Sequence, residues 1–166
     1  MAALALCAAP ASSQISEQAV KAAFLPKIAR YVSWPAAATP PAGAPFHLCV
    51  AGGDPFGRLL DEATAGQLIE QRPIAVRRVA GGERLGNCQI LFARGGSAAQ
   101  LLAAVRGQAV LTVTDSRDTP VRGMIHFALK GGRVSFHIDE AQAAAASLTI
   151  SSRLLAIALS VKSRRT

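Results

Sequence analysis

A β-hairpin pattern near the carboxyl end constrains the fold of this chain more than any other feature of its 166-residue sequence. Residues 124–139 alternate between apolar and polar side chains around Gly131-Gly132, a pair typical of a two-residue hairpin turn. The turn pairs Lys130 with Arg133 and sets His126 opposite His137. A slip of one residue would bury both histidines, so the register is well determined. Six apolar side chains then share the other face: Ile125, Phe127, Leu129, Val134, Phe136 and Ile138.

Short apolar runs alternate with helical patterns upstream of this hairpin. Strands are expected over residues 46–51, 74–79, 88–93 and 109–114. Helices are expected over residues 16–33, from about 54 to 65, over 97–105, and after the hairpin over 140–146 and 151–162. Strands that alternate with helices form parallel βαβ units. We therefore predict an α/β fold: a single three-layer domain with a mostly parallel sheet, a C-terminal β-hairpin and terminal helices.

Local signals suggest how the predicted helices begin and bend. Pro26 is expected to kink the first helix, and the proline-rich residues 35–45 form an irregular connector after it. Asp54 is the expected cap of the second helix, and Ser97 that of the third. The pair Trp34-Pro35 at the end of the first helix is either an exposed anchor for a partner or a plug in the core.

The first residues are typical of the end of a secretory signal. Residues 2–9 are apolar, and Ala9-Pro10-Ala11 is similar to a signal-peptidase site, so we assign 1–13 to a signal remnant and 14–166 to the domain. Lipidation at Cys7 is the less favoured alternative, because Leu6 is too large for the position before a lipidated cysteine. We expect a soluble, periplasmic mature chain, since no other stretch has the length and hydrophobicity of a membrane span.

Removal of the signal leaves two cysteines, Cys49 and Cys88. In an oxidising compartment they are expected to form a disulfide that closes a loop of about 40 residues. Two separate buried thiols are the alternative. Neither a Cys-x-x-Cys motif nor a Cys/His zinc spacing is present in the sequence, which disfavours redox catalysis and structural zinc.

The histidine face of the hairpin is a weak candidate for a metal site. His126 and His137 can reach one ion from facing strands, and Asp139 or His47 is the candidate third ligand. A plain polar sheet surface is the favoured interpretation, and a partner contact is the remaining one. We therefore predict no bound metal.

Signals for nucleotide binding and for catalysis are also weak. The loop from Gly52 to Gly57 carries Asp54 where a dinucleotide fingerprint needs glycine, and an acid there repels a pyrophosphate. Asp115 follows a strand where α/β enzymes often place a catalytic acid, although an ordinary turn is favoured. The nucleophile elbow and the His-Glu-x-x-His motif are both missing from the sequence. We predict a protein that is not an enzyme and has no cofactor.

The chain carries 18 Lys+Arg against 10 Asp+Glu, a formal net charge of +8. A hydrophobic content of 51% and a charged content of 17% exclude a disordered chain. The basic residues are scattered along the sequence and do not alternate with aromatic residues, so we expect no nucleic-acid binding. The excess charge instead suggests steering toward an acidic protein partner or an anionic membrane surface.

Short motifs from residue 17 to residue 164 occur in an order and spacing that resemble the YfiR family of small exported α/β proteins. The stretches are 20–25, 32–35, 46–50, 52–57, 88–92, 110–115, 123–127, 132–138 and 151–155. The positions we single out in them are Phe24, Trp34, Pro35, Gly52, Asp54, Phe56, Gly57, Asp115, Phe127, Phe136, Ser152 and Leu154. Each stretch alone is a weak signal for the family, whereas the order and spacing of the whole set are specific to it.

The resemblance implies a periplasmic, non-enzymatic regulator. Members of the family are dimers that bind the periplasmic sensory domain of an inner-membrane diguanylate cyclase and hold it inactive. An OmpA-like outer-membrane lipoprotein sequesters them in turn. The resemblance also supports the pairing of Cys49 with Cys88, and it implies that this chain lowers cyclic-di-GMP and biofilm formation. The alternative function is a periplasmic small-ligand-binding domain that uses the crevice at the carboxyl ends of the strands, near Gly52, Asp54 and Asp115.

Overall fold

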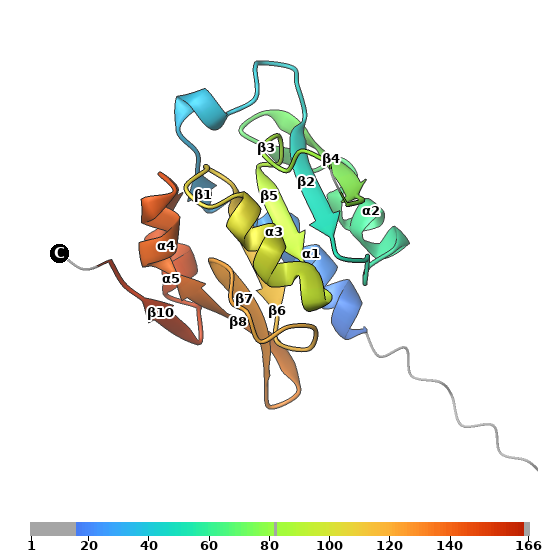
Figure 1. Cartoon of the computed structure of the whole chain (residues 1–166), viewed down its shortest axis with the longest axis vertical. Helices are drawn as coiled ribbons and strands as arrows, with labels where there is room; N and C mark the ends of the chain where they lie inside the picture. Colours follow the sequence, from blue (N-terminus) through green and yellow to red (C-terminus); the bar gives the residue numbers. More distant parts are fainter. Residues whose placement is uncertain (1–15, 82, 165–166) are drawn as a thin grey trace, which may run out of the picture.

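The computed structural model describes residues 16–81 and 83–164, so the expected signal remnant and the alternative at Cys7 lie outside the described residues. Within these ranges the main strands are β2 (Phe46–Ala51), β3 (Leu68–Ile69), β4 (Arg72–Val79), β5 (Ile90–Ala93), β6 (Leu111–Asp115), β7 (Ile125–Lys130), β8 (Arg133–Asp139) and β10 (Ser160–Lys162). They form one curled sheet in the order β10-β8-β7-β6-β5-β2-β4-β3 (Figure 1). Neighbouring strands are parallel except in the pairs β7/β8 and β3/β4. The predicted α/β domain with a mostly parallel sheet and a hairpin is confirmed.

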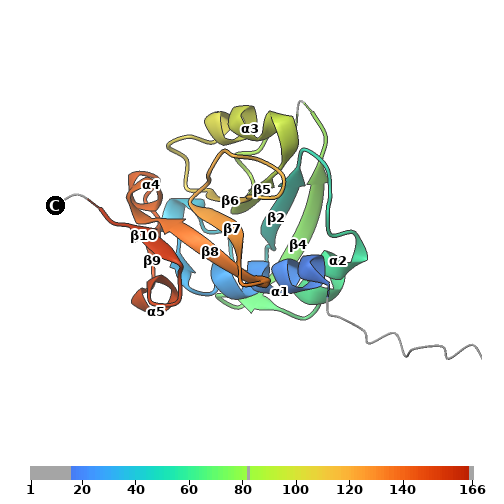
Figure 2. The ribbon, with the colours of Figure 1, turned by 90° about the horizontal axis from the view of Figure 1, so that it is seen from below.

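Helices cover both faces of this sheet. Figure 2 shows α3 (Ala98–Ala104) above one face, and α1 (Glu17–Ala29) with α2 (Arg58–Thr64) below the other. The helices α4 (Glu140–Ala145) and α5 (Ser152–Leu155) lie on either side of β10, the edge strand next to β8. Two short 3₁₀ turns, η1 (Ala36–Ala38) and η2 (Gly95–Ser97), lie in the connections.

Alternate side chains of the central strands belong to two separate hydrophobic clusters, one on each face of the sheet. Leu48 and Val50 of β2 belong to the large cluster under α1 and α2, which also takes in Phe92 of β5. Their neighbours Cys49 and Ala51 belong to a smaller cluster with residues of α3. Both faces of β2 and β5 are covered, and accordingly β5 is entirely apolar and β2 is apolar except for His47, as is usual for parallel strands in three-layer folds.

The first helix is shorter than its sequence pattern predicted. Ser16 caps α1 by accepting a hydrogen bond from the Ala19 amide at 3.1 Å, and the helix continues through Pro26 to Ala29. The expected final turn is absent because residues 32–33 form β1 (Val32–Ser33), which pairs antiparallel with β9 (Thr149–Ile150). That pairing joins two segments far apart in the sequence, so no local signal marks it.

The second helix begins later than expected. Gly57 takes the cap position of α2, and its φ of +51° is a backbone conformation that favours glycine. Asp54 instead accepts a hydrogen bond from the Phe56 amide at 2.8 Å and pairs with Arg78 at 2.9 Å. Ser97 precedes α3 as predicted but makes no side-chain capping bond.

The hairpin has the register predicted from its sequence. Lys130 pairs with Arg133, Phe127 with Phe136, and Ile125 with Ile138. His126 is opposite His137, as the alternation indicated. Phe127, Phe136 and Ile138 are all buried in the core.

The carboxyl-terminal segment departs from the predicted long helix over residues 151–162. It forms only the single turn of α5 and then β10, which runs parallel to β8. Leu154 is buried as expected, whereas Ile157 is 63% exposed. The physical reason is the open edge of β8, whose backbone groups need partners: the Leu159 amide donates to Phe136 O at 2.8 Å as β10 begins.

Candidate functional site

A disulfide links Cys49 of β2 to Cys88 just before β5, as the sequence predicted. Their Cα atoms are 5.8 Å apart, and both residues are buried in the cluster under α3. Because β2 and β5 are neighbours in the sheet, the bond ties the two strands at its centre. A disulfide of this kind fits an oxidising compartment such as the periplasm.

A buried ion pair lies at the carboxyl end of β6. The ammonium of Lys21, on α1, contacts the carboxylates of Asp115 and Glu17, and the Lys21 and Asp115 side chains are 0% and 1% exposed. The second carboxylate oxygen of Asp115 accepts a hydrogen bond from the Arg117 amide at 3.0 Å. Asp115 therefore does make a turn, as expected, but its main contact is a buried cation that joins α1 to the sheet.

Glu17 connects this pair to the surface. Its carboxylate contacts Lys21 on one side and the Arg117 guanidinium on the other, at 2.9 Å. The hydrogen bond from Lys21 lowers the pKa of Glu17 despite an opposing effect of burial, and Arg117 lowers it further. The arrangement is a chain of alternating charges that neutralises Lys21 within the fold.

The candidate residues for a ligand crevice are held by different partners. Asp115 is paired with Lys21, whereas Asp54 is paired with Arg78, which also binds Asp61 at 2.7 Å. At Gly52 a Cβ atom would lie 2.2 Å from the Arg94 carbonyl oxygen, and its φ is +84°. Gly52 therefore serves a close backbone approach between the ends of β2 and β5. Two hollows lie at this end of β2 and β4: one of about 210 Å³ next to Asp54 and Arg78, and one of about 400 Å³ between Gly52 and α3.

The expectation of an open polar surface around His126 is wrong. His126 is 3% exposed, and its Nδ1 lies 2.7 Å from the hydroxyl of Thr114 on β6. The same hydroxyl accepts a hydrogen bond from the Gly123 amide at 2.9 Å, which ties the end of the β6–β7 loop to β6 beside His126. Burial, Arg122 and His137 lower the pKa of His126 to about 4, so the ring is neutral near pH 7.

His137 and Asp139 have separate contacts of their own. His137 Nδ1 lies 2.7 Å from the Ser160 hydroxyl of β10, and burial and Arg122 lower its pKa. The two histidine rings are 6.4 Å apart between centroids. Asp139 caps α4 through the Gln142 amide at 2.8 Å and pairs with Lys162 at 3.0 Å. In residues 16–81 and 83–164, no three His, Cys, Asp or Glu side chains are grouped to hold a metal ion.

The aromatic residues singled out in the sequence lie in the core, except Phe24, which is partly buried and packs against it. Trp34 is 7% exposed, packs edge-on against Phe46 with centroids 4.9 Å apart, and donates its indole N–H to Gln89 O at 3.3 Å. The core-plug alternative for Trp34 is thus the correct one. Further aromatic contacts are Phe24 with Phe127 and Phe136, and Phe56 with Phe92. Pro35 precedes the turn η1, and its carbonyl oxygen accepts a hydrogen bond from the Ala38 amide. Ser152 is the exposed first residue of α5.

Sequence analysis did not identify Lys21, although a signal for it was present. Lys21 lies four residues after Glu17 and four before Leu25, which places it on the same helical face as a core leucine. A lysine on that face needs a buried acid as its partner. The partner, Asp115, is 94 residues away in the sequence, so the helix pattern by itself does not name it.

The fold and these contacts define a small disulfide-bonded α/β protein whose buried charges are neutralised within the chain. A YfiR/HmsC-like family model matches residues 18–159, and the chain belongs to this family. No curated protein sequence matches the chain. Among the described residues, no helix has the length and apolar character required to cross a membrane. Membership of the family supports a general role as a periplasmic regulator.

Proposed function

We propose that this chain binds the periplasmic sensory domain of an inner-membrane diguanylate cyclase and holds the enzyme inactive, without catalysis of its own. Cyclic-di-GMP and biofilm formation would fall as a result. The observation that carries this proposal is the family match over residues 18–159, which spans β2 to β8, the disulfide and the Lys21–Asp115 pair. Homodimerisation and sequestration by an OmpA-like outer-membrane lipoprotein belong to the same proposal and rest on the family resemblance.

Inhibition of this kind is a shift of a conformational equilibrium. A regulator that binds only the inactive cyclase lowers the active fraction by its differential affinity for the two states. Moving the equilibrium from 1:99 to 99:1 requires binding about 10⁴-fold tighter to the inactive state. The chain therefore needs a stable, preorganised surface rather than a reactive group, and the internally neutralised Lys21–Asp115 pair suits that requirement.

The surface charge supports an acidic partner. Several exposed cations make no ion pair within residues 16–81 and 83–164: Lys27, Arg30, Arg84, Arg106, Arg122, Lys130, Arg133 and Arg153. Exposed cations without an ion pair raise the rate of encounter with a negatively charged domain. The effect weakens with salt, because exposed charges are screened over about 10 Å at 0.1 M ionic strength.

The test combines a cellular and a binding measurement. Deleting the gene should raise cyclic-di-GMP in a strain that carries the cognate cyclase and leave it unchanged in a strain that lacks the cyclase. The purified chain should bind the isolated periplasmic domain, with an association rate that falls as salt rises. Cyclic-di-GMP that stays constant on deletion in the cyclase-positive strain would contradict the proposal.

A further inference from the structure

The connection between β6 and β7 leaves part of one sheet face without a helix. These parallel neighbours are joined by the loop 116–124, where a parallel crossover usually contains a helix. Consequently α3, which follows β5, and α4, which follows β8, are not separated by a third helix on this face. Thr112 and Thr114 of β6 point to this side, since Leu111 and Val113 belong to the core cluster on the other.

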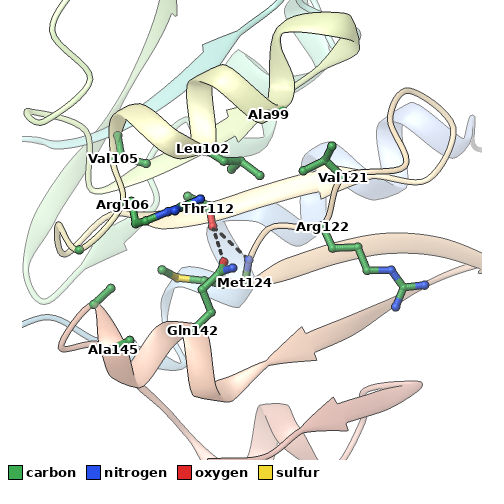
Figure 3. Close-up of a pocket in the computed structure, with 12 residues that line it drawn as sticks. Ala99, Leu102, Val105, Arg106, Thr112, Val121, Arg122, Met124, Gln142 and Ala145 are labelled. Atoms are coloured by element: carbon green, nitrogen blue, oxygen red, sulfur yellow. Dashed lines mark hydrogen bonds between the residues drawn. The ribbon is translucent and has the colours of Figure 1, made fainter.

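A cavity of about 460 Å³ occupies the position of the missing helix (Figure 3). Its walls come from α3 and the turn after it, from the β6–β7 loop, and from α4. Short side chains such as Ala99, Ala145 and Ala146 line it and leave the space open. Its size lies within the range of about 300–1,000 Å³ that is usual for small-molecule sites. Leu102, Val105, Val121 and Met124 make much of the remaining lining apolar.

The floor of the cavity carries a fixed polar group. Thr112, 3% exposed, accepts a hydrogen bond from the Met124 amide at 3.0 Å, and its hydroxyl lies 3.5 Å from Gln142 Oε1. The Gln142 side-chain amide nitrogen makes no hydrogen bond within the described part of the chain, so it keeps donors for a ligand. Figure 3 shows the Gln142 side chain rising from α4 toward Thr112.

Two arginines lie at opposite ends of the cavity and differ in direction. Arg106 reaches inward over Thr112, whereas the guanidinium of Arg122 points outward from the opposite mouth (Figure 3). Neither makes an ion pair in residues 16–81 and 83–164. The Arg106 end of the cavity therefore combines apolar walls with one exposed guanidinium that has no ion pair, and its fork of N–H donors matches a carboxylate.

We propose that this cavity binds a small amphipathic anion, with an apolar ring or short chain between α3 and α4 and a carboxylate on Arg106. The site is separate from the crevice near Gly52, Asp54 and Asp115, because none of those residues lines it. The proposal does not depend on cyclase inhibition. Charge complementarity favours an anion over a neutral or cationic occupant of the same shape.

The test uses three probes of one shape and different charge: 3-phenylpropionate, 3-phenylpropan-1-ol and 3-phenylpropylammonium. Binding to the full chain is measured by calorimetry and by amide NMR shifts. We expect the carboxylate to bind and to shift the amides of Ala99, Met124 and Ala146. The alcohol should bind at least about tenfold more weakly, as expected for the loss of a hydrogen bond between charged groups. The ammonium should not bind.

Matched variants locate the anion. Arg106→Gln should weaken 3-phenylpropionate binding about tenfold or more, whereas Arg122→Gln, which removes the same charge from the outward side chain, should change it less than about threefold. Ala145→Phe, which fills the cavity from an exposed position of α4, should abolish binding while the far-ultraviolet circular dichroism spectrum stays unchanged.

Three results would overturn the proposal. The first is equal affinity for the carboxylate and the alcohol. The second is an equal loss of binding in Arg106→Gln and Arg122→Gln, which would mean a diffuse charge effect. The third is a set of shifts at Ala99, Met124 and Ala146 that follows protein concentration rather than ligand, which would assign the cavity to a second copy of the chain.

Discussion

Replacing Lys21 with methionine removes the cation of the buried pair while keeping a side chain of similar length. Asp115, 1% exposed, then remains as a charge without its main partner between α1 and β6. Breaking a buried ion pair from one side usually costs about 3–5 kcal/mol, since the remaining charge has lost both water and its counter-ion. We expect Lys21→Met to reduce the free energy of unfolding by an amount in that range.

The double variant separates charge burial from packing. In Lys21→Met/Asp115→Asn the buried site is neutral, and the asparagine oxygen still accepts from the Arg117 amide, which lies 3.0 Å from Asp115 in the native chain. Replacing both members of a buried pair by neutral groups is often close to neutral for stability. We therefore expect the double variant to be more stable than Lys21→Met by about 2 kcal/mol.

Urea unfolding of the wild type, both single variants and the double variant completes the thermodynamic cycle. The urea midpoints should shift while the dependence of the unfolding free energy on urea concentration stays the same, so that differences between midpoints report stability alone. Two results would refute the reasoning: a loss below about 1 kcal/mol in Lys21→Met, or single-variant losses that simply add in the double variant. Either would mean that water reaches the pair and that Lys21 is not neutralised by burial beside Asp115.

Two further predictions concern the disulfide and His126. The disulfide closes a loop of 39 positions, so Cys49→Ala/Cys88→Ala should lose up to about 4 kcal/mol of unfolding free energy, measured in urea. A loss near zero would contradict this prediction. So would two free thiols found by mass spectrometry of the protein from the periplasm. The pKa of His126 falls from 6.5 to about 4 on folding, so the unfolded chain binds more protons between these values. His126 therefore has no effect on stability above pH 6.5, and it destabilises the fold increasingly as the pH falls toward 4, because protonation favours the unfolded chain. In His126→Gln, the urea concentration at the unfolding midpoint should therefore depend less on pH within that interval. The same pH dependence as in the wild type would mean that His126 does not cause it.

The pattern of alternating residues predicted the central fold because it depends on short-range geometry. In the hairpin, the two-residue turn and the period of two together determine every pair from Lys130/Arg133 to Ile125/Ile138. The apolar runs at β2 and β5 likewise predicted strands, and the structure covers both of their faces. Helix ends were less predictable, because α1 stops where Val32 joins β9 and α5 stops before β10 joins β8.

The candidate site was predictable only where residue type alone decides the chemistry. The sequence favours a disulfide between Cys49 and Cys88 over two separate thiols because these two cysteines remain once the expected signal is removed, and the structure contains that bond. The alternation places His126 on the correct face of the hairpin, but its burial accompanies contacts with Thr114 of β6, whose hydroxyl also binds Gly123 of the β6–β7 connection. Its burial therefore depends on a segment whose path does not follow from the pattern of the strand.

The sequence by itself determined the hairpin register, the α/β class and the disulfide, because each follows from spacing, periodicity or the count of one residue type. Only the tertiary structure decided that Lys21 meets Asp115, that β10 completes the edge of β8, and that a cavity opens between α3 and α4. These features depend on which segments become neighbours. That choice is made by the burial of charge, by unpaired backbone groups and by side-chain volume across the whole core, and none of these is expressed in a local pattern.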